Sequence, residues 1–147
     1  MLKQTSLAVA IFAFLAGCQT TTTGPSGNSI NAPRPQAQEI PEDFYQLAFN
    51  AGVASTLGQR CRSVFYSKTT ADRAERDAVQ DLMSRGYIAN DIKAWTRNLP
   101  KARMQADLIN YLETNNVVIG DRDSVCAAAR REIAAGSAVG RFLRERG

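Results

Sequence analysis

Apolar and small residues recur every three or four positions from Pro41 onward, and this spacing is typical of one face of an α-helix. Pro41 precedes Glu42 and Asp43, which suits a helix start because proline fits the first turn and acids favour the positive end of the helix dipole. We therefore predict a long amphipathic first helix, whose alanine- and glycine-rich face permits close approach of a neighbour. Its inward positions are Phe44, Leu47, Ala48, Ala51, Ala54, Gly58, Cys61 and Phe65.

Start and stop signals divide the following residues into further helices with short connections. We expect an all-α domain over residues 41–147, a small bundle of five or six helices with antiparallel neighbours. Val117-Val118-Ile119 is the only strand-like run, and we predict that it forms a buried connector. The expected boundary residues are Thr69 or Thr70 and Gly86-Tyr87 for the second helix, Asn90 or Asp91 for a short third, Asn98-Leu99-Pro100 and Asn115-Asn116 for the fourth, Asp121 to Ser124 and Gly136 for the fifth, and Ser137 for a final one.

Each of these helices carries an expected inner stripe. Trp95 is the only tryptophan, and in a small helical domain such a residue more often anchors the core than serves as a ligand platform. The stripes are Ala71, Ala74, Ala78, Leu82 and Met83 in the second helix; Ile92 and Trp95 in the third; Ala102, Ala106, Ile109 and Leu112 in the fourth; Val125, Cys126, Ala129 and Ile133 in the fifth; and Val139, Phe142 and Leu143 in the final one.

Residues 1–17 have the pattern of a secretory signal that is removed. Lys3 precedes an apolar core from Leu7 to Leu15, which is too short to cross a membrane. The small residues Ala16 and Gly17 before Cys18 resemble the lipobox of bacterial lipoproteins, in which the cysteine is joined to a diacylglyceride and its amine is acylated. By the sorting rule of such lipoproteins, a residue other than Asp after the cysteine favours the outer membrane. An ordinary signal peptide with a nearby cysteine is the alternative.

Residues 18–40 are predicted to be a lipidated cysteine followed by a flexible tether. Four threonines at 20–23, a Gly-Pro-Ser-Gly run at 24–27 and two further prolines leave few apolar side chains to offset the entropy of ordering. The tether either lets the domain reach a partner or is simply a spacer.

The charge balance of the processed chain is mild. The full sequence has 147 residues with 18 basic and 14 acidic side chains, and removal of residues 1–17 takes away one lysine and no acid, leaving 17 against 14. A net charge of about +3 and an exported location do not fit a nucleic-acid-binding protein.

Two cysteines remain beside Cys18, and both lie on predicted apolar stripes. In an oxidising compartment, the inward placement of Cys61 and Cys126 favours a disulfide between them. Two buried thiols and a redox-active pair are the alternatives, although the spacing is not Cys-x-x-Cys.

The sequence lacks the residues that most enzyme mechanisms need. It contains no histidine, which excludes Ser-His-Asp and Cys-His catalysis and histidine-ligated zinc. We therefore expect no enzyme activity, no cofactor and no metal. Paired carboxylates alone can hydrolyse a glycoside, but the candidate acids are expected at helix caps or solvent-facing positions. They are Glu42, Asp43, Asp72, Glu75, Asp77 and Asp107.

Five arginines are concentrated near the C-terminus, with few acids between them. Guanidinium groups suit phosphate and carboxylate, so this segment is a candidate contact for an anionic lipid or an acidic partner. A solvated helix face is the alternative. The arginines are Arg130, Arg131, Arg141, Arg144 and Arg146.

Several short motifs occur in a characteristic order between residues 48 and 143. They are Cys61, Arg85-Gly86-Tyr87, Asp91 to Trp95, Lys101 to Met104, Tyr111-Leu112, Gly120-Asp121, Ser124-Val125-Cys126, Glu132-Ile133-Ala134, Gly136-Ser137 and Gly140. This succession is similar to a small alphaproteobacterial exported family, domain of unknown function 5333. The resemblance implies a helical domain with its two cysteines paired and no assigned activity. The lipobox and the long tether depart from that pattern.

We expect a non-catalytic, lipid-anchored protein of the cell envelope, on the outer membrane and facing the periplasm, that docks on an envelope protein complex. The alternatives are a carboxylate-dependent hydrolase acting on peptidoglycan or lipid, and a binding module for a small apolar or anionic ligand held between helices.

Overall fold

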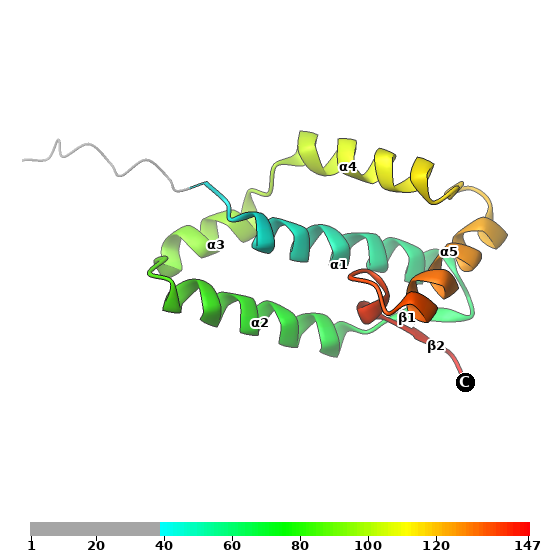
Figure 1. Cartoon of the computed structure of the whole chain (residues 1–147), viewed down its shortest axis with the longest axis horizontal. Helices are drawn as coiled ribbons and strands as arrows, with labels where there is room; N and C mark the ends of the chain where they lie inside the picture. Colours follow the sequence, from blue (N-terminus) through cyan, green and yellow to red (C-terminus); the bar gives the residue numbers. More distant parts are fainter. Residues whose placement is uncertain (1–38) are drawn as a thin grey trace, which may run out of the picture. The chain divides into compact units, whose positions relative to one another are not determined.

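The computed structural model describes residues 39–147, and this part of the chain forms five helices and a two-stranded ribbon (Figure 1). The all-α fold class is confirmed, with the ribbon as an addition. The signal sequence, Cys18 and most of the tether lie outside the described residues. Within residues 39–147 no helix has the length and apolar character to cross a membrane. The elements are α1 (Glu42–Arg60), β1 (Val64–Tyr66), α2 (Lys68–Ser84), α3 (Ala89–Arg97), α4 (Lys101–Thr114), α5 (Arg122–Ala135), the 3₁₀ turn η1 (Gly140–Phe142) and β2 (Leu143–Glu145).

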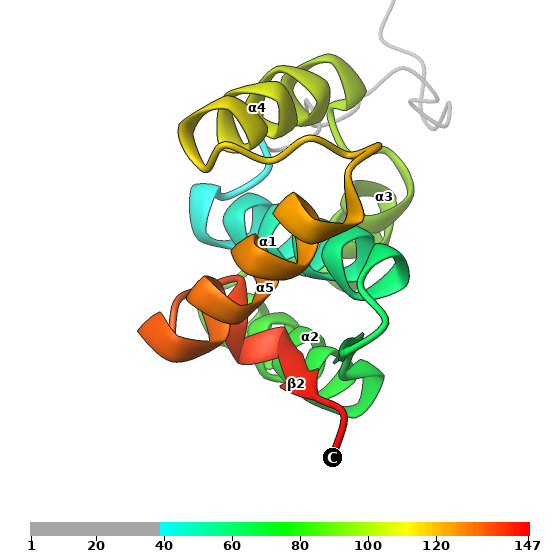
Figure 2. The same cartoon turned by 90° about the vertical axis from the view of Figure 1, so that its right-hand side faces the viewer.

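Helix α1 is the central element, and it lies between α2 and α4 in both of two perpendicular views (Figures 1 and 2). It ends at Arg60, so the prediction that it continues to Phe65 is wrong. Cys61 is already extended, with φ −101° and ψ 121°. A Cβ on Gly58 would lie 2.7 Å from the backbone nitrogen of Tyr66. Glycine at this position therefore lets the chain turn back across the last turn of α1 as a strand.

The ribbon joins β1 to the last strand of the chain. The strands are antiparallel, with Phe65 opposite Arg144 and Tyr66 opposite Leu143. Two further backbone bonds extend the pairing, from Ser67 N to Phe142 O (2.7 Å) and from Arg146 N to Ser63 O (2.9 Å).

The predicted final helix after Ser137 is wrong, because the chain makes one 3₁₀ turn there and enters β2. The hydroxyl of Ser137 accepts from Gly140 N at 2.8 Å, although the residue directly before the turn is Val139. A Cβ on Gly140 would lie 1.9 Å from the carbonyl oxygen of Glu132. The turn therefore lies directly against α5, and pairing with β1 supplies the hydrogen bonds that a helix would have supplied.

Two predicted helix starts need correction. Helix α2 is capped by Ser67, whose hydroxyl accepts from Thr70 N at 3.4 Å, and not by Thr69 or Thr70. Helix α3 begins at Ala89 after Ile88, without a side-chain cap, ahead of the expected Asn90 or Asp91.

The remaining local signals are confirmed. Helix α4 begins directly after Pro100, and Asp121 caps α5 by accepting from Asp123 N. Gly86 and Gly136 end their helices with φ of 92° and 58°, a conformation that glycine adopts without a Cβ penalty.

The predicted inner stripe of α4 is wrong except at Leu112, which packs against the main core. Ala102, Ala106 and Ile109 face solvent, and the side toward the protein carries Leu108 and Tyr111 instead. Tyrosine can be buried along its ring while its hydroxyl finds a polar partner, so Tyr111 can occupy an inward position of α4. Met83 on α2, also expected inside, is 55% exposed.

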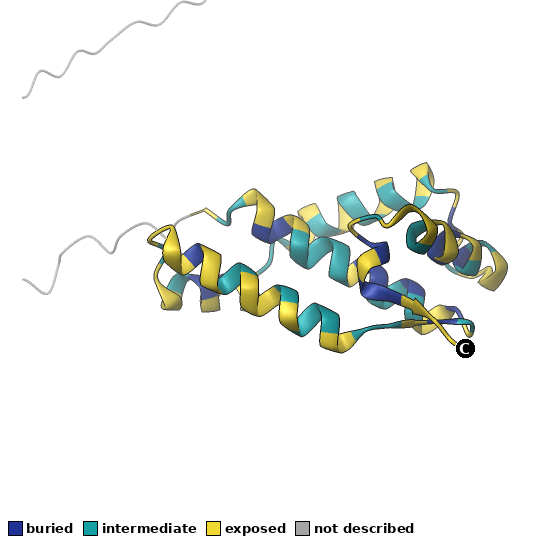
Figure 3. Cartoon of the chain, turned by 60° about the horizontal axis from the view of Figure 1, so that its bottom comes forward, coloured by how far each residue is buried: buried dark blue, intermediate teal, exposed yellow. Residues whose placement is uncertain are grey.

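The main core lies where α1, the ribbon and α5 meet. Figure 3 shows the burial of each residue along the chain, with buried residues in dark blue and exposed residues in yellow. Cys61 and Cys126 form a disulfide there, with their Cα atoms 5.0 Å apart. Val117 belongs to this core, but Val118 is 62% exposed, so the predicted buried connector is buried only in part. The fully buried members of the core include Ala54, Leu57, Val64, Val125, Phe142 and Leu143.

A second, smaller core closes the other end of α1. It consists of Phe44, Leu82, Ile92 and Trp95, with Tyr87 packed against them. The ring centroids of Tyr87 and Trp95 are 5.4 Å apart in an edge-to-face arrangement. Trp95 is therefore a core anchor, as predicted.

Candidate functional site

The ribbon has one buried face and one open face. Side chains alternate between the faces of a strand, and Val64 and Leu143 on the inner face are fully buried. Phe65 and Arg144 lie opposite each other on the outer face. Phe65 is 37% exposed, which is unusual for a phenylalanine. We call the outward side chains of Ser63, Phe65, Arg144 and Arg146, with Arg130, the ribbon face.

Arg146 and Arg130 approach this face from two directions. The guanidinium of Arg146 lies 5.7 Å from the centre of the Phe65 ring, within the range of a cation–π contact. Arg130, on α5, donates to the hydroxyl oxygen of Ser63 at 2.9 Å. A strand residue, a helix residue and a residue after the last strand are thus brought together.

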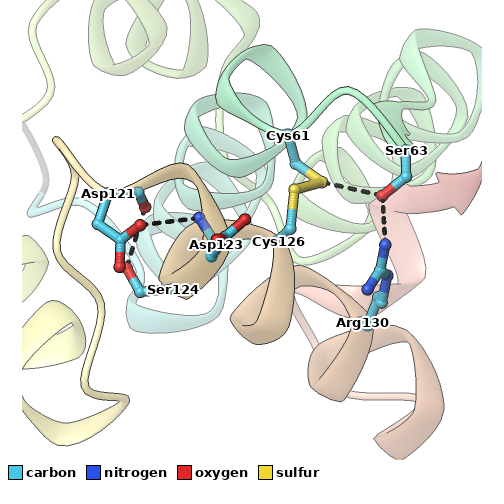
Figure 4. The surroundings of a disulfide bond; sticks show 7 residues. All are labelled: Cys61, Ser63, Asp121, Asp123, Ser124, Cys126 and Arg130. Atoms are coloured by element: carbon cyan, nitrogen blue, oxygen red, sulfur yellow. Dashed lines mark hydrogen bonds between the residues drawn. A yellow bond between two sulfur atoms is a disulfide. The ribbon is translucent and has the colours of Figure 1, made fainter.

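The disulfide fixes this arrangement (Figure 4). A disulfide sulfur carries no hydrogen, so the hydroxyl of Ser63 donates toward Cys61 Sγ across 3.2 Å while it accepts from Arg130. Arg130 lies one helical turn after Cys126. The bridge therefore holds both the start of the ribbon and the base of the Arg130 side chain.

The arginines of the ribbon face have no carboxylate partner in the part of the chain that the structure describes. The five ion pairs found there involve other residues. Arg144 donates to the carbonyls of Arg141 and Leu143 and toward the hydroxyl of Thr70. Glu145 lies between Arg144 and Arg146 in sequence, but the alternation of the strand directs it to the other face. The positive charge of this face is therefore not neutralised by an ion pair.

The other two arginines of the predicted contact lie elsewhere. Arg131 donates to the carbonyl oxygen of Asn115, at the end of α4, at 2.8 Å. Arg141 stacks on Phe142, with 4.6 Å between its guanidinium and the ring centre, and lines a cleft with Asp77 and Asp81. The structure thus gathers three of the five arginines.

Most of the candidate acids form ion pairs or hydrogen bonds at the surface. Arg103 donates to Glu42 at 2.6 Å and lowers the pKa of that carboxyl, with Gln46 contributing. Within residues 39–147 no group of three histidine, cysteine or acidic side chains is placed to hold a metal ion. The remaining pairings are Asp43 with Arg85, Asp72 with Lys68 and Asp107 with Arg103, while Glu75 and Asp77 are exposed.

Two partly buried polar contacts were not predicted. The hydroxyl of Tyr45 donates to Asp107 at 2.6 Å, and that of Tyr111 donates to Glu132 at the same distance. Burial and then the neighbouring carboxylate raise the pKa of Tyr45 to about 12, and the same two causes raise the pKa of Tyr111. The sequence signal that could have indicated these contacts is the presence of a tyrosine at an inward position of each helix. These contacts attach α4 to α1 and to α5 and belong to the framework of the fold.

Comparison with protein families matches residues 36–144 to a family described as "Family of unknown function (DUF5333)". No curated protein and no solved structure matches the chain. The matched residues include the ribbon face except for Arg146, together with both cysteines.

Proposed function

The chain belongs to the DUF5333 family, whose description assigns no activity, and from the geometry above we propose that it is a non-catalytic module that docks through the ribbon face on an acidic surface of a protein in the cell envelope. The observation that carries this proposal is an exposed phenylalanine beside arginines that have no carboxylate partner within residues 39–147. Aromatic and arginine side chains are the residues most enriched at the energetic centres of protein interfaces.

The charge of the ribbon face supports an acidic partner. The whole chain carries only a small net charge, so a local group of arginines directs an anionic surface to one place on the domain. The rigid guanidinium fork forms paired hydrogen bonds with carboxylates. Phe65 adds an exposed apolar contact to this surface.

A protein partner fits this surface better than a membrane surface does. Recognition of anionic lipid by charge alone typically uses clusters of about four to eight basic residues, and the ribbon face offers three. These three are also held by the disulfide, the strand pairing and Ser63, and a fixed geometry favours a partner with fixed carboxylates.

The anchor is proposed from the sequence. Lipidation of Cys18 would hold the domain on the periplasmic side of the outer membrane, and residues 19–40 would give it reach. Two or more acyl chains hold a protein firmly where one does not. Replacement Cys18→Ser is expected to release the protein from membranes washed at high salt, and retention would contradict lipidation.

A crosslinking experiment tests the docking proposal. Native membranes that contain the tagged full chain are mildly crosslinked, and the captured proteins are identified by mass spectrometry. The ribbon variant Phe65→Ala with Arg146→Glu is compared with a matched control, Ile88→Ala with Arg97→Glu, which also removes one exposed apolar side chain and reverses one charge on α3. We expect one partner in near-equal amount, lost in the ribbon variant and kept in the control.

Two outcomes would overturn the proposal. One is equal capture by the ribbon variant and the control. The other is sedimentation of the purified domain with vesicles that contain phosphatidylglycerol, abolished by the ribbon variant, because this would assign the surface to lipid.

A further inference from the structure

The interface between α1 and α2 contains a cleft of about 210 Å³. Its apolar lining comes from Leu47, Ala48 and Ala51 on α1, Ala71 on α2 and Leu99 after α3. An engineered apolar cavity of about 150 Å³ binds benzene, whereas pockets for drug-sized molecules begin near 300 Å³. The cleft is therefore sized for one ring or a short alkyl chain.

The sequence explains why this space stays open. Ala48 and Ala51 on α1 and Ala71 on α2 line this space, and such short side chains would permit close helix contact. The helices are held by larger groups at both ends instead: Tyr66 lies at the ribbon end, and Phe44 packs with Leu82 and Trp95 at the other. The alanines cannot fill the space between these two supports.

One rim of the cleft is acidic. Asp72 and Glu75 lie one turn apart on α2 and both line the opening. Lys68 binds Asp72 at 2.7 Å, whereas Glu75 forms none of the ion pairs found in residues 39–147. The hydroxyl-bearing side chains of Tyr66 and Thr96 complete the lining. Burial and then Asp72 raise the pKa of Tyr66, which places its phenol in the field of this rim.

We propose that the α1–α2 cleft binds a small molecule with an apolar body and a protonated amine, the body lying against the alanines and the amine meeting Glu75. A site with an apolar floor and a few polar groups is the usual form of a small-molecule site. The negative rim selects a cation over a neutral or anionic head group of the same shape. This site lies at α2 and does not depend on the docking proposal for the ribbon face.

The same rim does not suit acid catalysis. A carboxylic acid that donates a proton at neutral pH is normally kept in an apolar, water-poor pocket. Here Glu75 is exposed and Asp72 already binds a lysine. Lys68 contacts both carboxylate oxygens of Asp72, so Glu75 is the carboxylate of this rim that is placed to attract a cation.

Three ligands with one body test the proposal: 2-phenylethylamine, 2-phenylethanol and phenylacetate, added to the ¹⁵N-labelled domain while amide shifts are followed by NMR. We expect saturable shifts at residues 47–51 and 71–75, with an apparent Kd of about 1 mM for the amine. The alcohol is expected to bind about fivefold more weakly, which is the upper range for a partly exposed charge pair, and phenylacetate to give no saturable shift.

Two variants locate the binding. Glu75→Gln is expected to reduce the preference for the amine over the alcohol to less than twofold, while Glu113→Gln, an exposed acid on α4, leaves it unchanged. Ala48→Leu fills the cleft and is expected to abolish saturable shifts for the amine and the alcohol, whereas Ala134→Leu, on the exposed side of α5, does not.

The proposal is overturned if the alcohol binds as tightly as the amine, if the shifts map outside the cleft, or if Ala48→Leu binds like the wild type. If the ribbon variant loses partner capture but binds the amine as the wild type does, the cleft and the docking surface are independent sites.

Discussion

The hydroxyl of Tyr45 donates to Asp107 Oδ2 across 2.6 Å, and this bond connects α1 to α4 between residues 62 positions apart. The guanidinium of Arg103 lies 3.7 Å from the centre of the same ring and also binds Glu42. Helix α4 contains no fully buried side chain. Its attachment therefore combines these polar contacts with the partly buried side chains of Leu108, Tyr111 and Leu112.

Replacement Tyr45→Phe is expected to lower the free energy of unfolding by about 1–2 kcal/mol, because Asp107 loses a short hydrogen bond at a partly buried position. Urea unfolding at pH 7 measures this change. Hydrogen exchange would show faster opening of residues 101–114 than of α5. Uniform acceleration across the domain would contradict a local role.

The pKa of Tyr45, about 12, predicts how stability changes with pH. The folded state holds this proton more tightly than the unfolded state, whose tyrosine has an ordinary pKa near 10. The stabilisation is fully present below pH 10 and is lost as the pH rises toward 12. Urea midpoints between pH 9 and 12 should fall more steeply for the wild type than for Tyr45→Phe, and parallel curves would refute this assignment.

The Cys61–Cys126 bridge closes a loop of 65 residues. A bridge of this span is expected to stabilise the domain by about 4 kcal/mol through the entropy of the unfolded chain. Cys61→Ala with Cys126→Ala should lower the free energy of unfolding by this order and make it insensitive to reductant. Reduction of the wild type should give the same loss, and an unchanged thermal midpoint would contradict both expectations.

Two glycines provide a matched comparison. Gly140→Ala would place a Cβ 1.9 Å from the carbonyl oxygen of Glu132, whereas Gly120→Ala meets no atom within 4 Å. We expect Gly140→Ala to cost more than about 3 kcal/mol and Gly120→Ala to change stability by less than about 0.5 kcal/mol. Chemical denaturation of both variants checks this. Similar values would show that the turn at Gly140 can move away from α5.

The orientation of α4 predicts different effects at neighbouring positions. Leu108 packs on the main core, whereas Ile109 is 57% exposed. Leu108→Gln is expected to destabilise the domain by about 2 kcal/mol, and Ile109→Gln by less than about 0.5 kcal/mol. Thermal unfolding of the two variants measures this difference. A larger loss of stability for Ile109→Gln than for Leu108→Gln would support the inner stripe expected from the sequence instead.

The features that could be predicted are those that depend on a few neighbouring residues. Pro100, Asp121, Gly86 and Gly136 set the ends of helices through their own backbone preferences. Trp95 and the paired cysteines also followed from residue type.

The features that could not be predicted depend on distant parts of the chain. Phe65 and Leu143 have helical spacing relative to their neighbours, yet they are strand residues because β1 and β2 meet. In α4 the alanines point outward because Leu108, Tyr111 and Leu112 pack toward the main core, where Tyr111 also binds Glu132 on α5. The open α1–α2 cleft arises in the same way, from supports outside the helices that line it.

The candidate site was predicted in part. The arginine-rich C-terminal segment indicated an anionic contact, but only the strand register places Phe65 beside Arg146 and only the disulfide places Arg130 beside Ser63. Local sequence contains neither relationship.

The position of the two cysteines has a consequence for the order in which the domain assembles. Cys61 comes just before β1, and Cys126 lies on the last helix before β2. In an open chain, the strands must find each other across nearly the whole domain, and such distant pairing is slow. Once the cysteines are joined, the strands are separated only by the short segments that lead away from the bridge, so the entropy of bringing them together is smaller. The oxidised chain should therefore complete its ribbon sooner than the reduced chain, and oxidation would act as a guide to folding as well as a stabiliser of its product.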